Sequence, residues 1–183
     1  MNREQALKLV KEKIKNQNLV KHCLAVEACM KALARHFNED EEKWGLAGLL
    51  HDIDYEQTKD DAHQHSIVGA KMLEDLGVEK EITEAVKTHN EIHGVLPETR
   101  LAKALFSVDP LTGLIVAATL VMPDKKIKEL SVENVLNRFK EKAFARGANR
   151  EIIEQCSKID LTLEKFVEIC LGTMQEISDK LGL

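Results

Sequence analysis

The stretch Gly48-Leu49-Leu50-His51-Asp52 sets an imidazole beside a carboxylate at the end of an uncharged run that begins at Trp44. The apolar run predicts a buried helix, and a buried charge is costly unless it is paired or bound to a metal. Neutral imidazole and carboxylate both ligate zinc, manganese and iron, so a divalent cation would satisfy the pair. Adjacent helical residues point about 100° apart, and we expect them to converge on one ion at the helix end. The alternative is a histidine that ends the helix beside a solvated aspartate.

The composition is that of an ordinary globular chain, and its 183 residues suit one domain over 1–183. Only three prolines, 4% aromatic residues and no low-complexity segment favour helices throughout. No uncharged apolar run reaches the ~20 residues of a membrane span, and the first residues lack the apolar part of a signal peptide. The cysteines lie in apolar helical patterns without a Cys-x-x-Cys pair, which predicts core thiols and a cytoplasmic location: Cys23, Cys29, Cys156 and Cys170.

The net charge of −5 argues against a long nucleic acid as partner. The charge is uneven, because residues 125–150 hold eight Lys or Arg against three Glu, a local excess of five positive charges. This stretch is either a solvated helical face or an anchor for a phosphorylated small molecule. For the second case we nominate Lys126, Arg146 and Arg150 as substrate-binding cations.

Two histidines lie on the apolar sides of predicted helices. In the helix predicted over 19–37, His22 sits at the edge of the apolar stripe near the helix start. In the helix predicted over 80–90, His89 shares a face with apolar residues three, four and seven positions earlier. Either ring faces the core as a metal ligand or as a hydrogen-bonded core residue.

An aspartate also faces the interior of a predicted helix. The apolar segment from Glu98 to Met122 places Asp109 on the same face as Leu105. Pro110 follows directly, and it must kink the helix or begin a new one with Asp109 as its N-cap. Asp109 is therefore either a ligand or a cap.

Taken together, His22, His51-Asp52 and Asp109 resemble the pattern of the HD superfamily of metal-dependent phosphohydrolases. The strings His-Asp-Ile-Asp-Tyr-Glu from His51, Asp-Pro-Leu-Thr-Gly-Leu-Ile from Asp109 and Pro-Asp-Lys-Lys from Pro123 resemble a prokaryotic subgroup of predicted hydrolases. The resemblance extends across nearly the whole chain. It implies an all-α, HD-type helical bundle with the metal site in its core. The metal-binding motifs would lie within 22–109, and C-terminal helices within 124–183 would complete the fold.

The resemblance also implies a place for a second metal ion. Some relatives with two metals add two histidines, which His65 and His89 match, with Asp52 as the bridge between the ions. The alternatives are that His89 donates to a backbone carbonyl, and that His65 simply begins a helix predicted from about His63 to Leu76 or is replaced by His63. Many relatives have glycine where this chain has Asp54, which we interpret as a partner behind a ligand, a proton acceptor or a loop cap.

The activity implied is hydrolysis of a phosphomonoester or phosphodiester of a small nucleotide-like substrate by metal-activated water. Asp52 would be both ligand and catalytic contact to that water. The cofactor would be one or two divalent ions, with manganese, iron, zinc, cobalt, nickel and magnesium all open. Two alternatives are a di-iron HD oxygenase and a non-catalytic ligand-binding or signalling helical domain.

Overall fold

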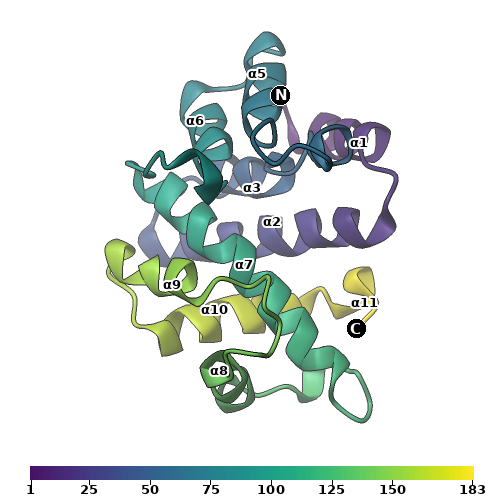
Figure 1. The fold of residues 1–183 in the computed structure, drawn as a ribbon, viewed down its shortest axis with the longest axis vertical. Helices are drawn as coiled ribbons and strands as arrows, with labels where there is room; N and C mark the ends of the chain where they lie inside the picture. The colour runs from purple at the N-terminus through teal and green to yellow at the C-terminus, as the bar shows by residue number, and fades with distance from the viewer.

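The computed structural model describes residues 1–183 and contains helices but no strand, which confirms the all-α prediction (Figure 1). The two longest helices, α2 (Gln17–Phe37) and α7 (Arg100–Leu120), pack against each other. The other elements are α1 (Arg3–Lys13), α3 (Glu41–Leu50), α4 (Tyr55–Thr58), α5 (Ile67–Asp75), α6 (Lys80–Thr88), η1 (Glu91–His93), η2 (Ile127–Glu129), α8 (Val132–Lys140), α9 (Arg150–Ile153), η3 (Glu154–Ile159), α10 (Leu163–Glu176) and α11 (Ser178–Leu181).

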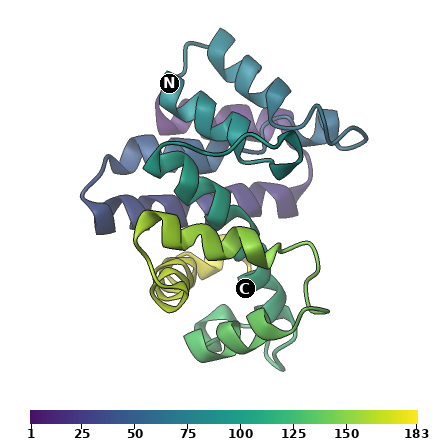
Figure 2. The same ribbon diagram turned by 60° about the vertical axis from the view of Figure 1, so that its left-hand side comes forward.

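Helix α2 packs against several of the other helices. It packs against α3 and also against α7, α10 and α11, while α6 packs against α3, α5 and α7. Both views place α5 and α6 at one end of the molecule and α8 at the other (Figures 1 and 2). The predicted metal ligands lie on α2 and α7, at the ends of α3 and α6, and in the turn before α5.

The core follows the predicted apolar stripes. One continuous cluster of 46 buried side chains runs from Ala6 in α1 to Leu181 in α11. The stripe of α2 is buried as predicted, including Cys23, Met30 and Leu33. All four cysteines are free and buried, so they serve as small core residues.

Helices α2 and α3 approach closely because Gly48 has no side chain. A Cβ atom at Gly48 would lie 2.9 Å from backbone atoms of both Val26 and Glu27. Backbone cannot swing away as a flexible side chain can, so this position requires glycine. The contact sets the end of α3, and with it His51, against the first half of α2.

One of the two alternatives at Pro110 and one helix start differ in the structure. Pro110 neither begins a new helix nor makes Asp109 a cap, because α7 continues through it and buries apolar residues on both sides. Proline removes one N–H from the ladder, and burial of this helix outweighs that loss. The helix expected from His63 begins at Ile67 instead, because Ser66 adopts a left-handed φ of 71° that a helix cannot contain.

Helix α7 is the one helix long and apolar enough to cross a membrane by length and composition. In this fold 67% of its apolar window is buried among the other helices.

The close approach at Gly48 gives a stability prediction. Gly48→Ala is expected to lower the free energy of unfolding by about 1–3 kcal/mol, because the helices must move apart. The matched control is Gly172→Ala in α10, where a new Cβ meets nothing within 4 Å; it should be neutral or stabilising by up to about 1 kcal/mol. Urea denaturation measures both, and a Gly48→Ala variant as stable as the wild type would contradict the packing.

Candidate metal centre

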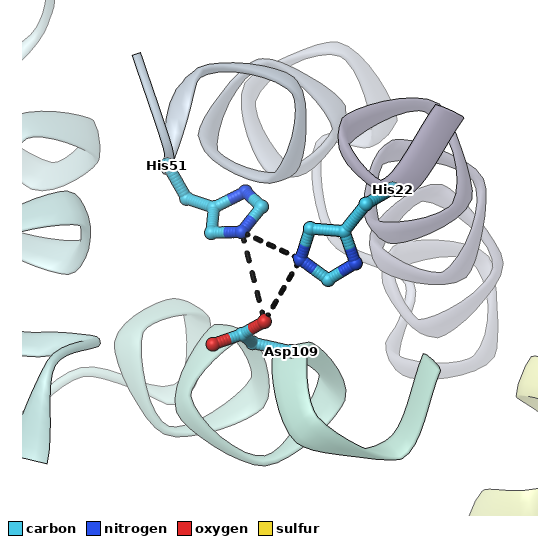
Figure 3. Close-up of side chains that lie close together, drawn as sticks. All are labelled: His22, His51 and Asp109. Atoms are coloured by element: carbon cyan, nitrogen blue, oxygen red, sulfur yellow. Dashed lines mark hydrogen bonds and ion pairs between the residues drawn. The ribbon is translucent and has the colours of Figure 1, made fainter. Parts of the chain in front are cut away.

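Three helices bring His22, His51 and Asp109 to one point (Figure 3). The Nε2 atom of His22 lies 3.1 Å from Nε2 of His51 and 3.0 Å from Oδ1 of Asp109. The third side of this triangle, from His51 Nε2 to Asp109 Oδ1, measures 3.7 Å. The residues come from α2, the end of α3 and the middle of α7, so the helix packing itself assembles the group.

Asp52 faces two pairs of histidines with its two oxygens. Its Oδ2 atom lies 3.4 Å from Nε2 of His51 and 3.8 Å from Nε2 of His22. Its Oδ1 atom lies 3.3 Å from Nε2 of His65 and 3.5 Å from Nε2 of His89. Asp52 is thus a buried carboxylate, 6% exposed, that lies between the two pairs of histidines.

These donors fit a divalent cation in kind and in spacing. Ligand atoms about 2.0–2.2 Å from one ion lie about 2.8–3.6 Å from each other, close to the separations around His22 and around Asp52. Imidazole nitrogen and carboxylate oxygen are donors that first-row transition metals accept. His51, Asp52 and His89 form a second group of three donors, whose ligand atoms all lie within 4.8 Å of one another.

All four imidazoles turn Nε2 toward the cluster. In each ring Nδ1 is held by an acceptor, which leaves Nε2 for the cluster. His51 donates to the carbonyl of Gly48 at 2.8 Å, and His89 donates to the carbonyl of Val86 at 2.6 Å. Hydrogen bonds of this kind fix the tautomer and orientation of metal-binding histidines. The alternative to metal binding at His89 was a hydrogen bond to a backbone carbonyl. That bond is present, but Nδ1 makes it, and Nε2 still faces Asp52.

The other two rings use side-chain acceptors. Thr112 lies one turn after Asp109 on α7, and its Oγ1 is 3.2 Å from Nδ1 of His22. The Thr112 hydroxyl donates to the carbonyl of Asp109 at 2.9 Å, so it accepts from His22. Nδ1 of His65 lies 2.9 Å from Oδ1 of Asp54.

Two helix ends point at the cluster. His51 and His89 are the C-cap residues of α3 and α6, and each takes the carbonyl three residues earlier. These carbonyls belong to the last turn of each helix, where the C=O groups have no hydrogen-bond donor within the helix. The carboxyl end of a helix carries a partial negative charge, so both ends favour a cation.

The electrostatics of the cluster also favour positive charge. Burial alone lowers the pKa of His51, but Asp52 and Asp109 more than offset it and raise the pKa to about 9. Burial likewise opposes the protonated form of His65, whose pKa Asp52 and Asp54 raise to about 10. Burial raises the pKa of Asp52, yet the surrounding histidines, His51 first, hold that pKa well below its usual range. Asp52 is therefore an ionised carboxylate.

The turn that carries His65 is tied to the end of α6. The carbonyl of His65 accepts from Nε2 of His93 at 2.8 Å and from the side-chain amide of Asn90 at 3.2 Å. Ser66 donates to the carbonyl of Lys87 at 3.0 Å. These contacts hold His65 beside His89, while His63 is exposed and takes no part. Asn90, His93 and Thr112 were not singled out as site residues from the sequence, since their roles depend on contacts between distant segments.

The three nominated cations lie in different settings. Arg146 is exposed and lines a hollow of about 350 Å³ together with His22 and Asp109. Arg150 donates to backbone carbonyls of the 138–148 segment, including those of Phe144 at 2.6 Å and Ala148 at 2.6 Å. Its guanidinium therefore holds the loop that presents Arg146. Lys126 is exposed at the start of η2, beyond the end of α7, and lines neither hollow beside His22.

A second hollow, of about 480 Å³, lies beside the centre and is lined largely by α2, α7 and α11. His22 and Gly113 line both hollows. Apolar side chains such as Val116 and Leu120 share the wall of the second hollow with Lys21. The candidate metal centre thus adjoins the cationic side chain of Arg146 through one hollow and an apolar surface through the other.

Comparison with known proteins identifies the family. A model of the HD domain matches residues 19–113, just over half of the chain, and the six predicted metal ligands lie within this range. The chain therefore belongs to the HD domain family, whose members bind divalent metals and are commonly metal-dependent hydrolases.

Relatives of known sequence fall in two groups. Ribonuclease Y of Lawsonia intracellularis is 32% identical over 139 residues, 74% of this chain and 26% of the relative. Ribonuclease Y of Thermosipho melanesiensis is 31% identical over 150 residues, 79% of this chain and 29% of the relative. An uncharacterised protein of Methanocaldococcus jannaschii is 28% identical over 150 residues, 78% of this chain and 86% of that protein. The chain spans about a quarter of the length of the ribonuclease Y relatives.

Competition between protons and cations at this centre gives a pH prediction. The pKa values of about 9 for His51 and about 10 for His65 mean that both rings are protonated at neutral pH, and a cation must displace these protons. Affinity for Mn²⁺ in chelator-treated protein should therefore rise with pH, by about tenfold per unit for each proton displaced. Calorimetric titrations between about pH 6.5 and 8.5 measure this. A pH-independent dissociation constant would contradict it, and His65→Gln should flatten the slope.

Proposed function

We propose that this protein is a metal-dependent phosphohydrolase that cleaves a phosphomonoester or phosphodiester bond of a small, nucleotide-like substrate. The observation that carries the proposal is the position of Asp52, whose two oxygens face His22 with His51 and His65 with His89. Each oxygen of Asp52 faces a pair of imidazoles, and a ligand shared by two cations explains this arrangement.

The residues divide into two sets of donors. His22, His51 and Asp109, with one oxygen of Asp52, would hold one cation, and His65 and His89, with the other oxygen, would hold a second. A bound divalent cation would lower the pKa of water and neutralise the charge on phosphate oxygens. Asp52, ionised and buried, would accept a hydrogen bond from the attacking water. This bond would orient the water so that a lone pair of the water oxygen points at the phosphorus atom.

The surroundings support a small substrate with one phosphate and an apolar group. Arg146 would pair with the phosphate, since it lines the same hollow as His22 and Asp109. The apolar hollow of about 480 Å³ beside His22 would receive the organic group, with Lys21 at its wall. Arg150 would support this arrangement through the loop carbonyls that it holds. We do not assign Lys126 a substrate contact.

The relatives support a phosphodiester as one form of the substrate. Two of them are named ribonuclease Y, and an RNA end presents the same phosphate and base as a nucleotide. The net charge of −5 and the small hollows favour a nucleotide or a short oligonucleotide over a long strand.

Activity gives the direct test. Purified protein loaded with Mn²⁺, Fe²⁺, Co²⁺ or Zn²⁺ should hydrolyse nucleoside monophosphates or short oligonucleotides, and Asp52→Asn should lower turnover by at least about 100-fold because the shared ligand is lost. The matched control, Asp60→Asn, removes an exposed carboxylate and should leave turnover unchanged. No turnover in fully loaded wild type would favour a binding domain, and oxygen consumption with two irons would favour an oxygenase.

Stoichiometry tests the number of ions. We expect close to two ions per chain in the wild type under metal-replete conditions, and about one in a variant with both His65→Ala and His89→Ala. Plasma emission spectrometry after gel filtration measures the ratio. A wild-type ratio of one that the double substitution does not change would falsify the two-metal proposal.

A further inference from the structure

We propose that Asp54 is a positioning residue that aims His65 at the second cation and tunes its affinity. The inference rests on the proposed function, because it concerns the cation that His65, His89 and Asp52 Oδ1 would hold. Asp54 stands where many relatives of the resembled pattern have glycine, so no role comes to it from that pattern.

Asp54 is a buried carboxylate committed to one imidazole. It is 1% exposed, and its single ion-pair partner is His65, at 2.9 Å from Oδ1 to Nδ1. Its Oδ2 atom accepts from the backbone N–H of Gly69 at 2.7 Å. Burying a carboxylate is costly unless it is paired, and this one is paired with a residue that also faces Asp52.

The contrast with the other three rings singles out His65. His51 and His89 donate to backbone carbonyls and His22 donates to a threonine hydroxyl, all uncharged acceptors. His65 lies on a turn, and the carbonyl three residues earlier, that of Ala62, accepts from Asn90 instead. Asp54 replaces the missing carbonyl with a charged acceptor. A carboxylate behind an imidazole fixes its tautomer and raises the basicity of the nitrogen that binds the metal.

Gly69 leaves the space that Asp54 needs. A Cβ atom at Gly69 would lie 3.1 Å from Cγ and 3.2 Å from each carboxylate oxygen of Asp54. The carboxylate is also the acceptor for the Gly69 amide, so it cannot retreat without losing that bond. The position of the Asp54 carboxylate therefore depends on Gly69, so substitutions at either residue test its role independently.

The experiment is Zn²⁺ calorimetry on the full chain after chelator treatment. The wild type should show two binding events. Asp54→Asn keeps the shape but removes the charge, and it should weaken one event by about 10–100-fold while leaving the other unchanged. Gly69→Ala should weaken the same event while keeping the carboxylate. The matched control is Glu27→Gln, which removes a buried carboxylate paired with Arg3 and Lys31 and with none of the four histidines, and it should change neither event.

A spectroscopic readout separates positioning from general support. In Zn²⁺-loaded, ¹⁵N-labelled protein, His65 should show a protonated, hydrogen-bonded Nδ1, and Asp54→Asn should shift this signal without moving those of His51 and His89. Unchanged Zn²⁺ events in Asp54→Asn, or equal weakening in Asp54→Asn and Glu27→Gln, would overturn the inference. If Asp54→Asn does not fold, an unchanged second event in Gly69→Ala overturns it.

The two proposals fail separately. Wild type that binds two Zn²⁺ ions with the expected Asp54 effect, yet hydrolyses no phosphoester with any of the metals, would remove the proposed function and leave this inference standing. Wild type that binds a single ion and hydrolyses phosphoesters would overturn this inference and leave the proposed function standing.

Discussion

The buried carboxylate of Asp52 is the constraint on which the rest of the site depends. A carboxylate that is 6% exposed must be compensated, and four imidazoles from three helices and a turn surround it. To place them there, α2, α3, α6 and α7 must meet at fixed points along their lengths. The glycine contact between α2 and α3 and the continuous course of α7 through Pro110 are both part of that arrangement.

Much of this centre could be predicted because helical periodicity reports which face is buried. His22, His89 and Asp109 fall on or beside apolar stripes. The structure brings His22 and His89 to Asp52, and it brings Asp109 to His22 and His51. The doublet His51-Asp52 was correctly placed at a helix end, since α3 ends at Leu50. The all-α class followed from the same stripes and from the scarcity of proline.

The missed features depend on contacts that have no local signal. Thr112, Asn90 and His93 hold ligands that lie 25 or more positions away in sequence. Ser66 has a left-handed backbone that an apolar repeat cannot reveal, so the helix start was placed too early. At Pro110 the sequence leaves a kinked helix or a new helix start open, and the burial of α7 on both sides of the proline decides for one continuous helix.

The balance of charge explains why this cluster of carboxylates and imidazoles is stable and can still accept a cation. Three carboxylates, Asp52, Asp54 and Asp109, lie among four imidazoles, and the carboxyl ends of α3 and α6 add partial negative charge. Protons and cations compete for that charge, which is why the pKa values of His51 and His65 are raised. Every ring is held through Nδ1, so exchanging a proton for a cation at Nε2 requires no rotation. The ligand atoms are thus already directed at the cluster, and we propose that the acceptors behind the rings, Asp54 above all, tune its affinity for a cation.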